Sequence, residues 1–160
     1  MPGQEAPLAY FLTWTTYGTW LHGDVRGSVD DTHNVYGHPC LEAQPSREAV
    51  LRERLAETPY WLGDAAREVV ARAIRAHAKF RGWRILALEV RTNHVHLVIE
   101  AHSHSPNQVM AQCKSWATRT LREQDLLGER KRVWTKMGST RSLWNTNAVR
   151  TAVDYTTRMQ

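Results

Sequence analysis

The stretch RILALEVRTNHVHLVIE, residues 84–100, constrains the fold more than any other part of the chain. Two runs rich in β-branched and aliphatic residues, ILALEV and VHLVI, flank the polar tripeptide at 91–93. This pattern predicts two antiparallel strands joined by a tight turn. His94 and His96 are two residues apart, and side chains on a strand alternate between its faces. Both imidazoles should therefore point to the same side of the sheet.

Two histidines this close on one strand allow two interpretations. Each could be a half-buried side chain that makes a single hydrogen bond. Burying two imidazoles among Leu, Val and Ile is costly, however, unless something occupies their lone pairs. A divalent metal ion would do so, because neutral imidazole is a common metal ligand. We therefore expect a metal site at His94 and His96, completed by a third ligand, water or substrate.

Three segments of the chain resemble a known family. The run TNHVHLV at 92–98 is similar to the His-hydrophobic-His signature of HUH endonucleases. Within that group it resembles the single-tyrosine transposases of bacterial insertion sequences and their REP-associated tyrosine transposase relatives. The opening YFLTWTTYG at 10–18 and the closing GSTRSLWN at 138–145 are similar too. The resemblance runs from about residue 9 to the end and is interrupted near 22–60.

The resemblance implies an activity and assigns the residues that carry it. The family cleaves single-stranded DNA and transfers strands through a 5′-phosphotyrosine intermediate, with Mg²⁺ or Mn²⁺ as the expected ion. Its nucleophile lies on the last helix, which here assigns Tyr155, although periodicity alone would place this side chain in the core. A polar residue one turn later completes the family's metal site. That position is Met159, a poor ligand for a hard cation, so the assignment moves to Gln160.

The predicted chemistry explains why a metal would be needed. A phenol has a pKa near 10, so only about one in a thousand is ionised at neutral pH, at a cost of roughly 4 kcal/mol. A divalent ion between the histidines and a phosphate would offset this cost and support the leaving 3′ oxygen. The phosphotyrosyl bond conserves the energy of the phosphodiester, so another 3′-OH can rejoin the strand.

Composition favours a nucleic-acid partner. The net charge is +5 and the pI near 9.6, with arginine, which grips phosphate in pairs of bonds, as the main source of positive charge. A solvated basic surface would give the same charge. We expect single-stranded or hairpin DNA as the ligand, and the resemblance adds a homodimer. The expected phosphate contacts are Arg72, Arg75, Lys114, Arg119, Arg122, Lys131, Arg132, Lys136 and Arg141.

Length and composition also bound the class of protein. A chain of 160 residues predicts a single domain, 1–160, with a long loop or insert at about 22–60. No run is apolar enough for a membrane span or a signal peptide, so we expect a cytoplasmic, nucleoid-associated protein. Cys40 and Cys113 form no CxxC motif, which favours reduced thiols over a zinc ribbon.

Taken in order, the chain predicts alternating strands and helices. Asp64, Ser46 and Asn145 or Thr146 are candidate helix caps, and the histidines at 102 and 104 fall in a loop, where a strand ladder would not fix their direction. The predicted strands are 8–16, 85–90, 95–99, 133–136 and, after a turn or bulge at 138–140, 141–144. The predicted helices are 46–57, 64–81, 106–126 (ended by Gly128) and 147–159. This order predicts an α+β, ferredoxin-like or RRM-like sandwich with the two histidines on a central strand.

Two other functions remain open at this stage. One is a non-catalytic nucleic-acid-binding module, a domesticated repressor or an RNA-binding ferredoxin-like domain, in which the histidines are structural. The other is a metal-dependent hydrolase of small phosphoesters. The departure at Met159 and the unmatched loop keep the first alternative open.

Overall fold

The computed structural model describes residues 5–19 and 56–158 of the chain. Most of the predicted loop or insert at about 22–60, including most of the predicted helix at 46–57, lies outside these residues. The end of that helix is described, and Ala56 and Glu57 are bends. Seven elements follow one another in the described parts: β1 (Ala9–Thr15), α2 (Asp64–Arg81), β2 (Arg84–Val90), β3 (His94–Glu100), α3 (Pro106–Glu123), β4 (Ser139–Leu143) and α4 (Thr146–Arg158).

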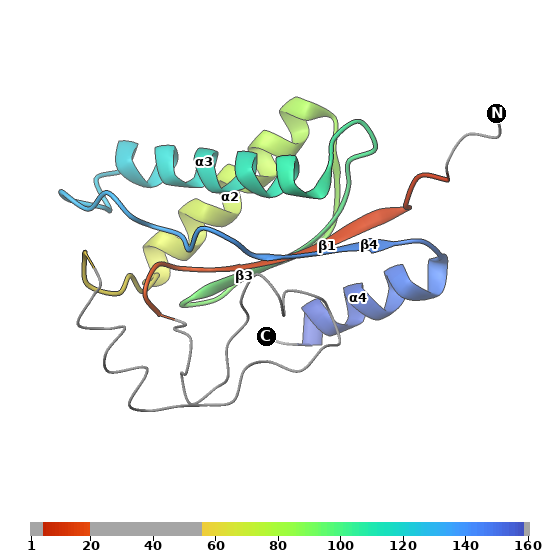
Figure 1. Ribbon diagram of the computed structural model, residues 1–160. Coiled ribbons are helices and arrows are strands. Elements are labelled where there is room, and N and C mark those ends of the chain that lie inside the picture. The colour runs from red at the N-terminus through yellow and green to blue at the C-terminus, as the bar shows by residue number, and fades with distance from the viewer. Residues whose placement is uncertain (1–4, 20–55, 159–160) are drawn as a thin grey trace.

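The four strands form one antiparallel sheet in the order β2-β3-β1-β4. Helices α2 and α3 cover one face of this sheet and α4 covers the other (Figure 1). The predicted hairpin is present, and the backbone N–H of Arg91 donates to the carbonyl of His94 (2.8 Å) across its turn. The α+β sandwich is therefore confirmed, and β3, which carries both histidines, is one of the two inner strands.

Alternation along the strands separates two cores. On β3, Val95, Leu97 and Ile99 are fully buried and pack into the large core beneath α2 and α3. Val98 points the other way, into a small core that contains Phe11 and one turn of α4. The period of two that placed the histidines together also puts them on the α4 side, because His94 and His96 alternate with Val95 and Leu97.

The helix ends follow capping rules, with two corrections to the predictions. Asp64 is the first residue of α2 and not its cap, which is Gly63, and its carboxylate pairs with Arg67. Helix α3 ends at Glu123, before the predicted Leu126 and Gly128. There Asp125 takes a left-handed conformation (φ 58°), and the amides of residues 125 and 126 bond back to the carbonyls of 122 and 121. Aspartate tolerates this conformation, so no glycine is required.

The predicted strand 133–136 is wrong as a strand. Within the described part of the chain it makes a single ladder pairing, a bridge between Trp134 and Thr16, although the segment stays beside the end of β1. Gly138 lies so close to the sheet that a Cβ would meet the carbonyl oxygen of Thr13 at 2.7 Å. The chain leaves the ladder after Trp134 and rejoins it at Ser139, within the segment 138–140 that was predicted as a turn or bulge.

Two further expectations concern the rest of the described chain. Across 5–19 and 56–158, none of the helices has both the length and the apolar character that crossing a bilayer requires. Cys113 is a buried free thiol in the large core, and burial raises its pKa to about 12. Cys40 lies outside the described residues, as does the greater part of the predicted 22–60 insert.

Candidate active site

The two histidines form one wall on the α4 side of the sheet. Their ring centroids are 4.7 Å apart and the rings are inclined by 75°. His96 is buried and His94 half-buried. Because an inner strand is hydrogen-bonded on both sides, its backbone holds the two rings at a fixed spacing.

His96 sits between β1 and α4. It pairs in register with Thr13, and the Thr13 hydroxyl lies 3.0 Å from His96 Nδ1. The Phe11 ring is on the same face, with its centroid 5.9 Å from that of His96. Burial lowers the pKa of His96 to about 4, with smaller contributions from the charges of His94 and Arg91. His96 is therefore neutral at physiological pH, which is the form that binds metals.

His94 has a neighbour in the turn as its partner. Its Nδ1 lies 2.8 Å from the side-chain oxygen of Asn93. Asn93 is itself buried, and its carbonyl accepts the backbone N–H of Thr16 (2.8 Å), which fixes the turn against the end of β1. Both histidines therefore have an oxygen at Nδ1, supplied by a different element in each case.

Helix α4 brings Tyr155 to this wall. The Tyr155 ring centroid is 5.7 Å from that of His96, nearly perpendicular at 85°, and 6.0 Å from that of Phe11. Ala152 packs against the sheet one turn earlier, whereas Tyr155 is 41% exposed. The predicted Asn145 cap is present, since its side-chain oxygen accepts the backbone N–H of Ala148 (2.8 Å). The phenol is thus accessible and beside His96 of the same chain.

The predicted third metal ligand, Gln160, lies outside the described residues, as does Met159. Among 5–19 and 56–158, no group of three or more His, Cys, Asp or Glu side chains could hold a metal ion. The two imidazoles would supply nitrogen ligands, so the remaining coordination positions of a hard cation would be filled by oxygen donors.

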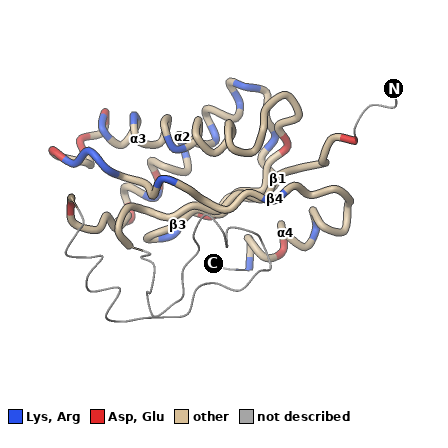
Figure 2. Tube along the Cα trace, in the orientation of Figure 1, with Lys and Arg blue, Asp and Glu red and all other residues tan. Residues whose placement is uncertain are grey.

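The residues predicted to contact DNA occupy two sides of the molecule. Five lie on the helices that cover the large core, namely Arg72 and Arg75 on α2 and Lys114, Arg119 and Arg122 on α3. Lys131, Arg132 and Lys136 lie between α3 and β4, where positive charge is also plain in Figure 2. Arg141 on β4 pairs with Phe11 and so faces the same side as the histidines. All nine are exposed except Lys114, which is half-buried.

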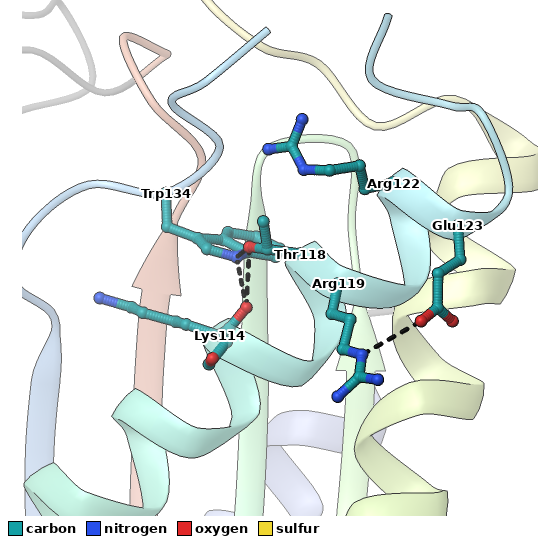
Figure 3. Close-up of a pocket in the computed structure, with 7 residues that line it drawn as sticks. Lys114, Thr118, Arg119, Arg122, Glu123 and Trp134 are labelled. Atoms are coloured by element: carbon teal, nitrogen blue, oxygen red, sulfur yellow. Dashed lines mark hydrogen bonds and ion pairs between the residues drawn. The ribbon is translucent and has the colours of Figure 1, made fainter.

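Three of these cations line one hollow on α3. Lys114, Arg119 and Arg122 surround a hollow of about 590 Å³ with Trp134 as its aromatic wall (Figure 3). The Lys114 ammonium donates to the carbonyl of Thr135 (3.0 Å), and burial lowers the pKa of this lysine to about 8. Arg119 pairs with Glu123 at 3.1 Å, so part of its charge is already compensated. The hollow lies on the α3 side of the sheet, away from the histidines.

Sequence reasoning missed two contacts of the histidine wall. Thr13 and Phe11 are two residues apart on β1 and lie on the same face of the sheet. Only the order of the strands places these two side chains against His96. On α3, Trp116 is 39% exposed and stacks on His77, with its ring centroid 5.3 Å from that of His77. No signal along the chain indicates that β1 lies beside β3. Asn93 could have been found, because it directly precedes His94.

The sequence was compared with known protein families. Residues 54–150 match the family model described as "Transposase IS200 like". The chain belongs to the IS200-like transposase family. The match covers both histidines and ends before Tyr155, so the place of the tyrosine depends on the geometry described above. The resemblance found in the sequence is thereby confirmed at the level of the family. No curated protein sequence matches the chain significantly.

Two solved structures share the fold of this IS200-like chain. A REP-associated tyrosine transposase bound to a REP hairpin is 14% identical, with a TM-score of 0.51 and 94% of this chain covered. The IS200-like chain spans 65% of that protein's length. A protein from Deinococcus radiodurans R1, described as a transposase, is 17% identical with a TM-score of 0.54, covering all of this chain and 95% of that one. At these identities the similarity supports the fold.

Proposed function

We propose that this protein is a transposase-like enzyme that cleaves single-stranded DNA and transfers strands in a metal-dependent reaction through a phosphotyrosine. The observation that carries the proposal is the meeting of three side chains on one face of the sheet. His94 and His96 have ring centroids 4.7 Å apart, and the Tyr155 ring is 5.7 Å from that of His96. Membership of the IS200-like family supports the class of reaction.

His94 and His96 are the proposed metal ligands, with Gln160 as the predicted third. The chemistry of the donors fits, because both rings have an oxygen partner at Nδ1 and His96 stays neutral down to about pH 4. A Mg²⁺ or Mn²⁺ ion held there would supply positive charge against the scissile phosphate and the leaving 3′ oxygen. A neutral imidazole adds no charge of its own as a ligand, so the positive charge of the ion would remain available for the phosphate.

Tyr155 is the proposed nucleophile. Its oxygen would form a bond to the scissile phosphorus while the bond to the 3′ oxygen breaks, so that the phenol proton is lost and the leaving oxygen becomes a 3′-OH. The product is a 5′-phosphotyrosine. A 3′-OH from another strand can attack this bond, restore the phosphodiester and return the proton to Tyr155. The exposed position of the side chain gives a DNA strand access to it.

DNA contacts would come mainly from the basic residues on the helical side. Lys114, Arg119 and Arg122 are the best placed, because they line one hollow with Trp134. Arg141 is the predicted contact on the histidine side. The structurally similar REP-associated transposase is bound to a hairpin, which supports single-stranded or hairpin DNA as the ligand here. A homodimer remains a prediction, although Tyr155 already reaches His96 within one chain.

The test is formation of a covalent adduct. Purified protein is incubated with hairpin-bearing single-stranded DNA and Mn²⁺, and adducts that survive denaturation are resolved on a gel. We expect an adduct in the wild type and none in Tyr155→Phe, because phenylalanine has no nucleophilic oxygen. The matched control Tyr60→Phe, which changes a tyrosine packed against the large core on the other face of the sheet, should form the adduct at wild-type levels.

Other outcomes would support the alternatives. DNA binding without any adduct in the wild type would contradict the enzyme and favour a non-catalytic binding module. Cleavage of small phosphoesters that persists in Tyr155→Phe would favour a metal hydrolase.

A further inference from the structure

The Nδ1 atoms of both histidines are held by side-chain oxygens. Asn93 Oδ1 lies 2.8 Å from His94 Nδ1, and Thr13 Oγ1 lies 3.0 Å from His96 Nδ1. Asn93 belongs to the hairpin turn and Thr13 to β1, so two separate elements of the fold converge on equivalent atoms. A neutral imidazole carries its proton on one nitrogen and a lone pair on the other. The partner at Nδ1 therefore decides which nitrogen can bind a metal.

The two partners restrict the tautomer of their histidines to different degrees. An amide oxygen can only accept, so Asn93 requires a proton on His94 Nδ1 and leaves the lone pair on Nε2. The Thr13 hydroxyl can donate or accept, so it is compatible with either form of His96 but supports the Nδ1–H form when it accepts. His94 is thus locked in one tautomer, whereas His96 is oriented and can adjust.

A purely structural role explains Asn93 poorly. Its side chain is buried, and its amide nitrogen Nδ2 has no hydrogen-bond partner among the described residues. Burying an amide donor without a partner costs free energy, which a smaller or apolar residue would avoid. The turn itself uses the backbone of Asn93, whose carbonyl accepts from Thr16. The contact that requires an asparagine side chain is the one to His94.

We propose that Asn93 and Thr13 are positioning residues that set the tautomer and orientation of His94 and His96, so that both present Nε2 to a divalent metal ion. This inference rests on the proposed function, because the ion is the one assigned to the histidine pair. Outer partners of this kind typically change metal affinity by about 10–100-fold when removed. Neither residue would touch the substrate or the metal.

The first test observes the tautomers in metal-free protein. Long-range ¹H–¹⁵N spectra of ¹⁵N-labelled protein near pH 7.5 distinguish the two neutral forms of each imidazole. We expect His94 in the Nδ1–H form in the wild type and a mixture in Asn93→Leu. An Nε2–H form of His94 in the wild type would overturn the proposal for Asn93.

The second test measures Mn²⁺ binding by calorimetry without DNA. Thr13→Val removes the hydroxyl at nearly constant shape and should weaken binding about tenfold, whereas Thr13→Ser keeps the hydroxyl and should restore it. Asn93→Leu should weaken binding similarly, and Asn93→Asp, which keeps an acceptor oxygen, should restore it. Thermal unfolding of each variant shows whether the fold is retained. If Asn93→Leu does not fold, the Thr13 pair and the wild-type spectra still decide.

The results separate this proposal from the proposed function. Wild-type Mn²⁺ affinity in both Thr13→Val and Asn93→Leu would overturn the positioning role and leave the metal site intact. Binding that survives the double change His94→Ala and His96→Ala would instead contradict the metal site of the proposed function. The tautomer spectra, recorded without metal, would then still test the role of Asn93.

Discussion

The two faces of the sheet are built for different purposes. Among residues 5–19 and 56–158, the face beneath α2 and α3 carries a core of twenty-one buried hydrophobic residues, whereas the face beneath α4 carries six. Within this part of the chain, the small core covers only part of its face. The histidine wall lies next to the small core on the same face of the sheet. The exposed Tyr155 contacts both Phe11 of the small core and His96 of the wall.

This asymmetry teaches how a small domain can support a chemical site. Buried apolar area on the helical face stabilises the sheet by about 25 cal/mol per Å², and the inner strands transmit that rigidity to the other face. The α4 face is then able to keep polar side chains partly open to solvent. Alternate residues of β3 therefore have different roles: one set packs into the large core and stabilises the fold, and the other set includes the two histidines of the candidate site.

The largest expected effect compares two valines on β3. Val95 and Val98 are both fully buried, but the first packs into the large core and the second into the small one. We expect Val95→Ala to lower the free energy of unfolding by about 2–3 kcal/mol and Val98→Ala by about 1–2 kcal/mol, because α4 can move to fill the smaller cavity. Urea unfolding measures both, and a larger loss in Val98→Ala would contradict the comparison.

A smaller effect is expected at the start of α4. Asn145 caps this helix by accepting the backbone N–H of Ala148, so Asn145→Ala should cost about 1 kcal/mol, and Asn145→Asp should restore the cap. Because α4 carries Tyr155, adduct formation should fall with helix stability. Adduct formation in Asn145→Ala that equals the wild type, despite the measured destabilisation, would show that the helix docks independently of its cap.

The smallest effect concerns pH and the helical side. Burial lowers the pKa of Lys114 to about 8 from 10.5, so the unfolded chain binds more protons between these values. The free energy of unfolding should therefore rise as pH increases from 8 to 10.5. Since this side chain is partly solvated, we expect a gain of only about 1 kcal/mol relative to Lys114→Met, measured by urea unfolding at pH 7.5 and 10. An equal pH response in both proteins would contradict the burial of this charge.

The elements with strong local signals were predictable. Hydrophobic periodicity predicts the hairpin of β2 and β3 and the buried face of α2. The glycine at position 82 is the residue that favours the left-handed conformation in which α2 ends. The ends of α3 and β4 were misplaced for local reasons. At the end of α3, Asp125 takes the left-handed conformation for which a glycine was expected. The segment around Trp134 has the composition of a strand but leaves the ladder before Gly138, which packs against the backbone of Thr13.

The candidate site was predictable only in part. The period of two placed His94 and His96 on one face, and the family resemblance assigned Tyr155. Thr13 could not be found, because no local pattern in β1 indicates that Thr13 pairs with His96, which follows it by 83 positions in the sequence. Long-range pairing is decided by the packing of the whole sheet, which local patterns do not encode. The order of strands therefore had to come from the structure.

The side chains that meet at the histidine wall come from widely separated parts of the sequence. Thr13 lies on β1, the histidines on β3 and Tyr155 on α4, so the first and last described elements both contribute. During synthesis the ribosome would release the histidines well before the tyrosine. A nascent chain would therefore lack the proposed nucleophile until α4 had been synthesised and had docked on the sheet.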